Sequence, residues 1–410
     1  MLTDKQLDKY AELAISVGIN LQKGQPVVLR TDVQNAFFAE IVAKKAYELG
    51  ASNVYTVWSN ERIERVRVDN TKQDVLCNIP AYDAQMYQYF VDQGAGFVSI
   101  LSSDPDNFEG CDSDKLTKYL LSARRSRQAL MSATMSNKNR WTIVSVPSQK
   151  WAKKIFPDLE TSVAVDKLWE AIAHAVRLDC DDPVKAWEEH IATMDRRAEY
   201  MTKRNFEYIQ FKSANGTDLK VGLAEGHIWT SAGEKAQDGV VFTANLPTEE
   251  IFTAPHKYKV EGIVKNALPL VDNGAVIDNF SLTFKDGKVV DFTAEKGYDA
   301  LKGILTTDEG STRIGEIALI GKKSPIAESG LLYYQTLFDE NASCHLALGA
   351  AYPTTVEGGN DMNEQQADKI GLNASVVHVD FMIGTKDLEI VGIGFDGSKE
   401  QLFVDGEWVI

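Results

Sequence analysis

The spacing of apolar residues changes near residue 181, and this change divides the chain into two parts that must fold differently. Before it, short apolar runs alternate with longer amphipathic segments, as strands and helices do in a parallel sheet. After it, short alternating runs are joined by Asn-Gly and Asp-Gly pairs, which favour hairpin turns between antiparallel strands. A chain of 410 residues also exceeds the size that one core usually reaches. The sequence therefore predicts an α+β protein with two domains.

The first domain is expected over residues 1–181, where helices and strands alternate along the chain. Strands are expected at 26–30, 53–58, 96–101 and 141–147, and helices at 4–17, 33–48 and 115–135. A parallel sheet covered by helices follows, because parallel strands need long crossover connections. No glycine-rich phosphate loop follows the strands that contain Val28 and Ile100. We therefore interpret this domain as a scaffold.

A helix over residues 182–205 is expected to link the two domains. Asp182 can cap the first free amides of such a helix, and Pro183 suits its first position. Residues 206–410 are expected to form a mostly β domain, curled or barrel-like, that carries the catalytic metal site. Its hairpin turns are predicted at Asn215-Gly216, Asp286-Gly287, Asp396-Gly397 and Asp405-Gly406.

The composition excludes several classes of protein. With 43 basic and 59 acidic residues the formal net charge is -16, which disfavours contact with nucleic acid or an anionic membrane. The N-terminal segment has the pattern of an amphipathic helix rather than a signal peptide or a spanning segment, so a cytoplasmic protein is expected. The four cysteines form no CxxC pair, which is typical of reduced thiols and argues against a cysteine-ligated zinc site.

Carboxylates and imidazoles gather between residues 245 and 380 in strand-like or turn-like segments. Six of them form the predicted ligand set: Glu250, Glu316, Glu340, His345, His378 and Asp380. His378 and Asp380 are the sharpest pair, because alternate residues of a strand point to the same face. Glu316 interrupts an apolar run, and a buried glutamate needs a partner. Four carboxylates and two imidazoles fit two divalent ions that share a bridging carboxylate, roughly 3.5 to 4 Å apart.

Each of these residues taken alone has a simpler interpretation. The pair Glu249 and Glu250 would more often be solvated surface, and His345 would more often be a core histidine. Tyr352 alone would be a packing residue, and His256 is interpreted as structural. The combination of all these groups in one stretch of chain favours a metal site instead.

Other kinds of site are less well supported. Cys344 beside His345 suggests a thiol nucleophile, but sequence neighbours on a strand point to opposite faces, and nearby carboxylates favour hard or borderline cations. No HExxH or GxSxG motif is present. The GxGxxG match at Gly392, Gly394 and Gly397 contains a hairpin turn and is followed by no helix, which argues against a dinucleotide-dependent oxidoreductase. A non-catalytic metal-binding or interaction protein with a vestigial site stays an alternative, although every ligand position is filled.

Four segments of the chain carry a family resemblance: NLPTEEIFTAP, RIGEIALIG, DENASCHLALGAAYP and HVDFMIG. With them the chain resembles the thermophilic-type metalloaminopeptidases, which include aminopeptidase T, aminopeptidase S and PepS-like enzymes, over essentially its whole length. The resemblance implies metal ligands at Glu250, Glu316, His345, His378 and Asp380, a further one at Glu340, and an active-site tyrosine at Tyr352. It also implies an α/β N-terminal domain, a dinuclear site in the C-terminal domain, and a homodimer that encloses the active sites.

The sequence is therefore interpreted as a metalloaminopeptidase that releases N-terminal residues from short peptides by two-metal-assisted hydrolysis. Zinc, cobalt, manganese or magnesium is the expected divalent cofactor. Glu316 or Glu340 is expected to shuttle the proton to the leaving amine, and Tyr352 to donate a hydrogen bond to the developing oxyanion. Short peptides and a second copy of the chain are the expected partners, whereas nucleic acid and membrane are not.

Overall fold

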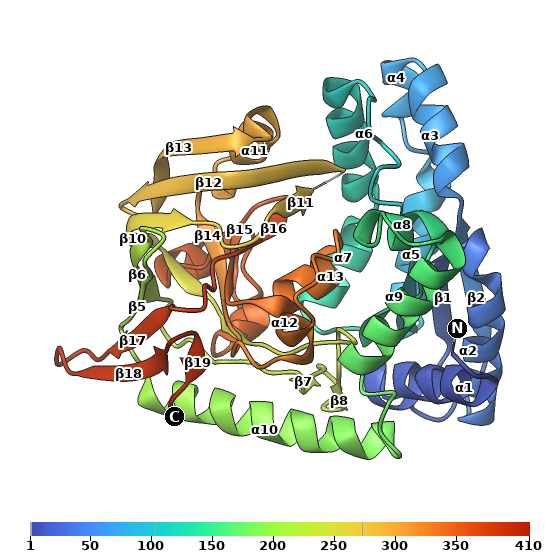
Figure 1. Cartoon of the computed structure of the whole chain (residues 1–410), viewed down its shortest axis with the longest axis horizontal. Helices are drawn as coiled ribbons and strands as arrows, with labels where there is room; N and C mark the ends of the chain where they lie inside the picture. The colour runs from blue at the N-terminus through green and yellow to red at the C-terminus, as the bar shows by residue number, and fades with distance from the viewer. Residues whose placement is uncertain (1, 103, 273) are drawn as a thin grey trace. The chain divides into compact units, whose positions relative to one another are not determined.

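The computed structural model describes residues 2–102, 104–272 and 274–410, and the chain divides into two compact units (Figure 1). The first unit comprises Met1–Glu189 and Glu234–Pro247. The second comprises His190–Gly233 and Thr248–Ile410. Helix α10 (Pro183–Arg204) begins in the first unit and ends in the second. The side chain of Asp182 accepts a hydrogen bond from the Lys185 amide at 3.1 Å, as the predicted cap requires.

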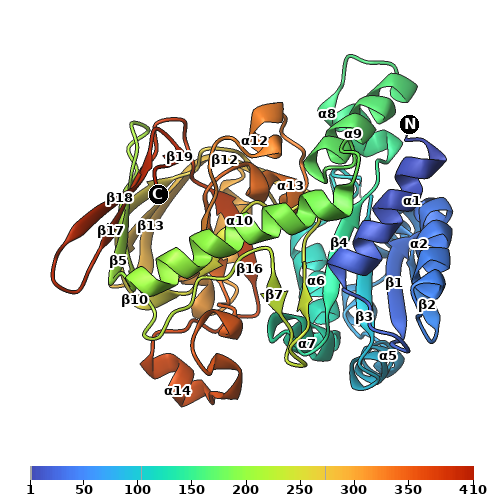
Figure 2. The same cartoon turned by 90° about the horizontal axis from the view of Figure 1, so that it is seen from below.

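The first unit contains a four-stranded parallel sheet, with its strands side by side in the order β2-β1-β3-β4 (Figure 2). The strands are β1 (Val27–Asp32), β2 (Val54–Ser59), β3 (Gly96–Leu101) and β4 (Trp141–Ser145), and all three pairings are parallel. The predicted parallel sheet is thus confirmed. A short hairpin, β7 (Glu234–Lys235) and β8 (Val241–Phe242), also belongs to this unit.

Helices connect these strands and flank the sheet. They are α1 (Asp4–Glu12), a π-helix (Leu13–Gly18), α2 (Ala36–Glu48), α3 (Glu61–Asn70), α4 (Gln73–Leu76), α5 (Ala81–Asp92), α6 (Ser113–Ser126), α7 (Gln128–Met135), α8 (Gln149–Ile155) and α9 (Thr161–Ala175). The single helix predicted over 115–135 is wrong, because Arg127 leaves helical geometry at φ -99° and ψ 18°. The Ser126 hydroxyl donates to the Ala123 carbonyl at this break, and the Arg127 side chain pairs with Asp83 instead of following the helix.

The second unit contains two antiparallel sheets, where the sequence predicted one curled or barrel-like sheet in a mostly β domain. The large sheet runs in the order β11-β12-β10-β6-β5-β17-β18-β19, and β13 pairs with β12. Its strands are β5 (Tyr208–Lys212), β6 (Asp218–Leu223), β10 (Pro255–Lys265), β11 (Leu270–Asp272), β12 (Ala275–Lys285), β13 (Lys288–Lys296), β17 (Glu389–Ile393), β18 (Lys399–Val404) and β19 (Glu407–Trp408). The small sheet runs β16-β15-β14-β9, with β9 (Ile251–Thr253), β14 (Ile314–Leu319), β15 (His345–Gly349) and β16 (His378–Met382).

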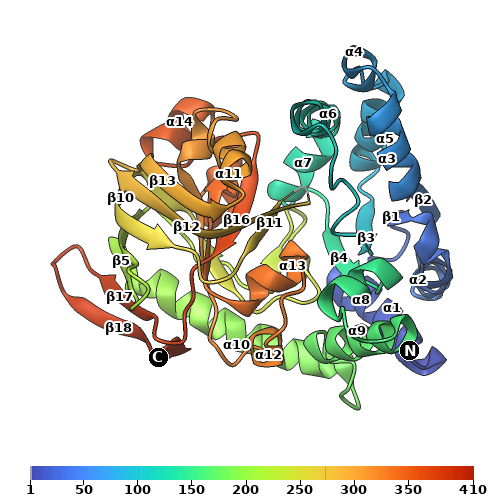
Figure 3. The same cartoon turned by 45° about the horizontal axis from the view of Figure 1, so that its top comes forward.

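Short helices complete the second unit: α11 (Tyr298–Leu305), α12 (Pro325–Ser329), α13 (Thr336–Asp339) and α14 (Glu364–Lys369). Figure 3 shows α11 beside β12 and β13, and its Leu301 and Ile304 join the main core of the unit. None of the helices in the part of the chain that the structure describes is long and apolar enough to span a membrane.

The predicted hairpin turns lie between the strands of the large sheet. Asp286 and Gly287, between β12 and β13, both have left-handed backbone, with φ of 50° and 76°. A Cβ atom at Gly287 would lie 1.8 Å from the Lys257 carbonyl oxygen, so only glycine fits there. Gly392 lies in β17 and Gly397 in the turn before β18. The GxGxxG match is therefore a hairpin, as predicted.

The small sheet separates apolar from polar side chains by strand alternation. Ile317, Leu346 and Phe381 point into the core of the unit. Their neighbours along the same strands include Glu316, His345 and Asp380, which point to the opposite face because strand side chains alternate. One face of this sheet is thus core, and the other carries the predicted ligands.

Candidate metal centre

The pairing register of the small sheet brings together ligands that are far apart in sequence. Glu316 of β14 pairs with Ala347 of β15, and Ala347 pairs with Asp380 of β16. The two carboxylates therefore lie in one row with only a methyl group between them. His378 lies two residues before Asp380 on the same face of β16. The small side chain of Ala347 leaves room between the polar groups.

Glu316 lies between the two imidazoles. Its Oε1 is 3.5 Å from His345 Nε2, and its Oε2 is 3.6 Å from His378 Nε2. Glu250 approaches the same His345 nitrogen at 3.0 Å, and Asp380 approaches the same His378 nitrogen at 3.3 Å. Each carboxylate oxygen of Glu316 thus faces a different histidine.

Both histidines are oriented by backbone carbonyls. His345 Nδ1 lies 3.0 Å from the Glu340 carbonyl oxygen, and His378 Nδ1 lies 2.7 Å from the Ala350 carbonyl oxygen. Because a carbonyl oxygen only accepts, each Nδ1 carries the hydrogen, and the neutral ring then offers the Nε2 lone pair to the site. This is the tautomer that metal-binding histidines adopt.

The site has more negative charge than its own cations can balance. Burial raises the pKa of Glu316 and raises that of Glu340 more strongly, and nearby Asp380 and Glu250 add to both shifts. Burial acts to lower the pKa of His378, but the Asp380 and Glu316 carboxylates outweigh it and raise the pKa to about 9. Glu250 and Glu316 likewise overcome the effect of burial and hold the pKa of His345 well above its usual value. Even with both imidazoles charged, four carboxylates would leave an excess of two negative charges.

The residues fit a divalent cation in two overlapping groups of three. Glu250, Glu316 and His345 offer ligand atoms within 4.8 Å of one another, and so do Glu316, His378 and Asp380. Glu250 Oε2 and Asp380 Oδ1 are buried and make no hydrogen bond in the protein, and each faces one of the two histidine Nε2 atoms. Buried carboxylate oxygens that face the lone pairs of neutral imidazoles favour a cation bound between them. The set therefore fits hard or borderline divalent cations such as zinc, manganese or magnesium.

Glu340 and Tyr352 lie beside the two groups rather than in them. Glu340 is buried in a short 3-10 helix (Glu340–Ala342), with its Oε1 3.5 Å from Asn341 Nδ2. The Tyr352 ring lies edge-on to His378, with ring centroids 5.1 Å apart, and also packs against Phe252. Neither residue belongs to the two groups of three, but the Tyr352 ring contacts His378, which is a member of one of them.

The residues interpreted as structural have environments that suit that role. His256 Nδ1 accepts a hydrogen bond from the Tyr258 amide, and burial lowers the pKa of the ring. The Cys344 thiol donates to the Ile320 carbonyl, and burial raises its pKa to about 12. A thiol with that pKa is protonated near neutral pH and is a poor nucleophile.

The sequence missed how the segment before β9 is positioned. Glu249, expected on the surface, is only 8% exposed, because His190 Nε2 lies 3.7 Å from its carboxylate. Asn341, which is fully buried, accepts a hydrogen bond from the Glu249 amide at 2.7 Å. Asn341 thereby fixes the backbone that presents Glu250. Asn341 immediately follows Glu340, and that adjacency is the one sequence signal that points to it.

A donor set of carboxylates and imidazoles that share one glutamate defines a metal-binding site of the kind found in metal-dependent hydrolases. The chain matches the family described as thermophilic metalloprotease (M29) over residues 3–408, and it belongs to that family. The resemblance noted in its sequence is thereby confirmed.

Named relatives match along the whole chain. Aminopeptidase 2 from Geobacillus stearothermophilus is 44% identical and the match covers 99% of this chain and 98% of the relative. Aminopeptidase T from Thermus thermophilus is 38% identical, with 99% of both chains covered. The solved structure of wild-type AmpT from Thermus thermophilus matches with a TM-score of 0.92 at 37% identity, again over 99% of both chains. The mixed α/β architecture, with one parallel sheet and further antiparallel sheets, agrees with that likeness.

Proposed function

We propose that this chain is an aminopeptidase that releases N-terminal residues from short peptides with the help of two divalent cations. The observation that carries the proposal is the position of Glu316, whose two oxygens face different histidines. Family membership and the relatives named as aminopeptidases support peptide hydrolysis, and they do not favour a vestigial, non-catalytic site.

The proposed ligands divide into two sets that share Glu316. Glu250 and His345 complete the first set, and His378 and Asp380 complete the second. Divalent cations bound there supply an acidified water and a polarised scissile carbonyl. Zinc, cobalt, manganese and magnesium all suit these ligands.

The remaining roles fall to residues beside the ligand sets. Glu316 has both oxygens directed at imidazoles, so Glu340 is the better placed of the two candidate carboxylates to carry a proton to the leaving amine. Tyr352, held edge-on to His378, donates a hydrogen bond to the oxygen that gains negative charge. A neutral substrate α-amine occupies the position next to the ligands, and this anchor restricts cleavage to the first residue.

Chromogenic substrates test this function directly. Purified protein should release p-nitroaniline from amino-acid p-nitroanilides, lose the activity in chelator, and regain it with added zinc, cobalt, manganese or magnesium. N-acetylated versions of the same substrates should not be cleaved, because they lack the free amine. Cleavage of the acetylated substrates, or full activity in chelator, would overturn the proposal.

We also propose that the chain works as a homodimer, as the resemblance to the family implies. Sedimentation velocity at several concentrations tests this. A species of twice the chain mass of 45.4 kDa supports the dimer, and a monomer at all concentrations contradicts it.

A further inference from the structure

A cavity lies in the first unit, and none of the proposed metal ligands lines it. Its volume is about 550 Å3, within the range of small-molecule sites. The last residues of β1, β2 and β3 line it, together with residues of α5. In the order β2-β1-β3-β4 the chain passes from β1 outward to β2 on one side of the sheet, and from β3 outward to β4 on the other side. The direction of the strand order therefore reverses between β1 and β3. Ligands of open α/β sheets bind at the carboxyl ends of the strands at such a reversal point.

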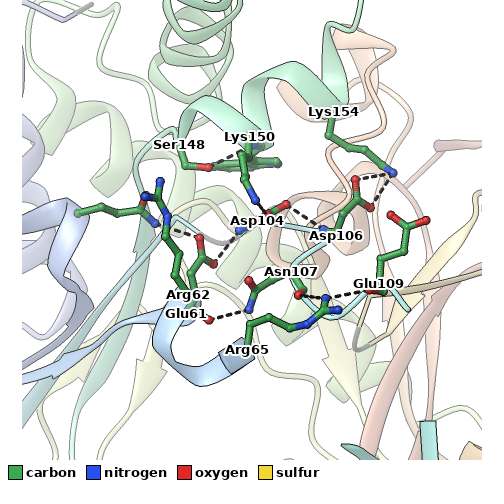
Figure 4. A network of polar contacts seen from close by, with 12 residues as sticks. Glu61, Arg62, Arg65, Asp104, Asp106, Asn107, Glu109, Ser148, Lys150 and Lys154 are labelled. Atoms are coloured by element: carbon green, nitrogen blue, oxygen red, sulfur yellow. Dashed lines mark hydrogen bonds and ion pairs between the residues drawn. The ribbon is translucent and has the colours of Figure 1, made fainter. Parts of the chain in front are cut away.

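Glu61, which lines the cavity, belongs to a polar network (Figure 4). Its Oε2 accepts a hydrogen bond from the Asp104 amide at 2.9 Å, and Asn107 donates to the Glu61 carbonyl at 3.0 Å. Lys150 of α8 pairs with the Asp104 carboxylate at 2.6 Å. The other carboxylate oxygen of Glu61, Oε1, lies 3.4 Å from Gln34 Nε2. These contacts fix the Glu61 carboxylate in one position.

Negative charge gathers in this corner. Asp32, at the end of β1, also lines the cavity, and its Oδ2 accepts a hydrogen bond from the Glu61 amide at 2.8 Å. Burial raises the pKa of Glu61, and the charges of Asp104 and Asp32 raise it further. Two carboxylates next to each other would be relieved by a positively charged group.

Two arginines also line the cavity. The guanidinium groups of Arg30 and Arg127 both lie 5.6 Å from the centre of the Tyr87 ring. Arg127 Nε lies 3.5 Å from Asp83 Oδ2, an ion pair without hydrogen-bond geometry. Arg30 donates to Ser99 at 3.4 Å, and it forms no ion pair with any residue that the structure describes. This guanidinium is thus available to an anion.

A buried hydroxyl and exposed aromatic rings complete the lining. Ser102 is 3% exposed, and its hydroxyl has no hydrogen-bond partner although it lines the cavity. Tyr82 and Trp58, also in the lining, are 69% and 45% exposed. Unsatisfied buried polar atoms call for a partner, and exposed aromatic rings favour contact with an apolar group.

We propose that this cavity binds a free amino acid with a large apolar side chain. Arg30 and Arg127 hold the α-carboxylate, Asp32 and Glu61 hold the α-amine, and Trp58 and Tyr82 contact the side chain. Arg30 and Asp32 are two residues apart on one strand, so they emerge on one face with their Cα atoms about 6.6 Å apart. The end of β1 thus offers both a cation and an anion to a ligand that carries an amine and a carboxylate. A role as a sensor of released product rests on the proposed function, whereas the binding itself does not.

Isothermal titration of the full-length protein with L-phenylalanine tests the site. We expect binding to one site that persists in Glu316→Gln, because no metal ligand takes part. Arg30→Gln should weaken it by at least about tenfold through loss of a charged hydrogen-bond donor. Arg125→Gln is the matched control, since Arg125 is exposed on α6 and does not line the cavity. 3-Phenylpropionate, which lacks the amine, and 2-phenylethylamine, which lacks the carboxylate, should each bind at least about tenfold more weakly.

Several outcomes would overturn this proposal. Binding that is lost in Glu316→Gln but unchanged in Arg30→Gln would assign the amino acid to the metal centre instead. If 3-phenylpropionate binds as tightly as L-phenylalanine, the cavity recognises only the carboxylate and not the amine. Absence of any heat with the wild-type protein would remove the site altogether. If Arg30→Gln fails to fold, as judged by circular dichroism, Arg127→Gln takes its place with the same expected weakening, because Arg127 is the other proposed partner of the carboxylate.

Discussion

The two units treat buried carboxylates in opposite ways. In the first unit the buried Asp104 pairs with Lys150 at 2.6 Å, and the more exposed Asp106 pairs with Lys154 at 2.8 Å. The charges of these two carboxylates are balanced by cations that the chain itself supplies. In the second unit four carboxylates share two imidazoles, and buried oxygens of Glu250 and Asp380 have no hydrogen-bond partner.

This difference separates a structural ionic network from a ligand site. A buried carboxylate that meets lysines and backbone amides needs nothing from outside, because its charge is already compensated. A buried cluster with surplus negative charge is stable only with protons or an external cation. Surplus charge, rather than the mere presence of acidic residues, thus marks the metal centre.

The largest effect should come from the residue that both ligand groups share. Glu316→Gln removes the negative charge that the two groups share and replaces one of its two ligand oxygens with an amide nitrogen, so kcat/KM should fall by about a thousandfold or more, and bound metal should be lost. Steady-state kinetics and elemental analysis of the same sample measure both. Asp106→Asn in the first unit is the matched control and should leave both values within about twofold. Full metal content in Glu316→Gln would contradict the assignment of Glu316.

A smaller loss is expected when the proposed hydrogen-bond donor is removed without touching a ligand. Tyr352→Phe should lower kcat roughly 100-fold, as loss of one oxyanion donor does, while metal content stays intact. The same kinetics and elemental analysis apply. Unchanged turnover would leave Tyr352 with a packing role against Phe252 and His378.

The surplus charge also predicts that removal of one buried carboxylate stabilises the protein. In chelator, Glu340→Gln should raise the free energy of unfolding by roughly 1 kcal/mol, because it removes one of four crowded carboxylates. Urea denaturation at pH 8 measures this. Asp106→Asn, which alters a carboxylate that Lys154 already compensates in the first unit, should not stabilise the protein. A clear loss of stability in Glu340→Gln would show that its carboxylate is compensated within the protein.

The smallest effect on activity is expected at the buried thiol. Cys344→Ala should leave kcat within about twofold and cost roughly 1 kcal/mol of stability through lost packing. Because burial raises the Cys344 pKa to about 12, iodoacetamide at pH 8 should modify exposed Cys180 and leave Cys344 intact. Peptide mass spectrometry after labelling distinguishes the two. Loss of activity that follows labelling of Cys344 would revive the thiol nucleophile.

Local pattern predicted the parts of the site that depend on neighbours in sequence. Alternation along β16 predicted that His378 and Asp380 share a face, and His378 Nε2 lies 3.3 Å from Asp380 Oδ1. An acidic residue in an apolar run predicted that Glu316 is buried, and every residue of β14 is buried. These features follow from strand geometry alone.

Contacts between distant segments account for what the sequence did not predict. Glu249 is buried because His190, nearly sixty residues earlier, and Asn341, about ninety residues later, meet it in space. The break at Arg127 depends on Asp83 and Tyr87 of another helix. The division into two antiparallel sheets likewise depends on register between remote strands, which turn pairs do not specify.

Anomalous scattering from a crystal grown with one divalent metal tests the central claim most directly. We predict two peaks in each chain, one beside Glu250 and His345 and the other beside His378 and Asp380, with Glu316 between them. A single peak, or peaks away from the small sheet of the second unit, would contradict the account.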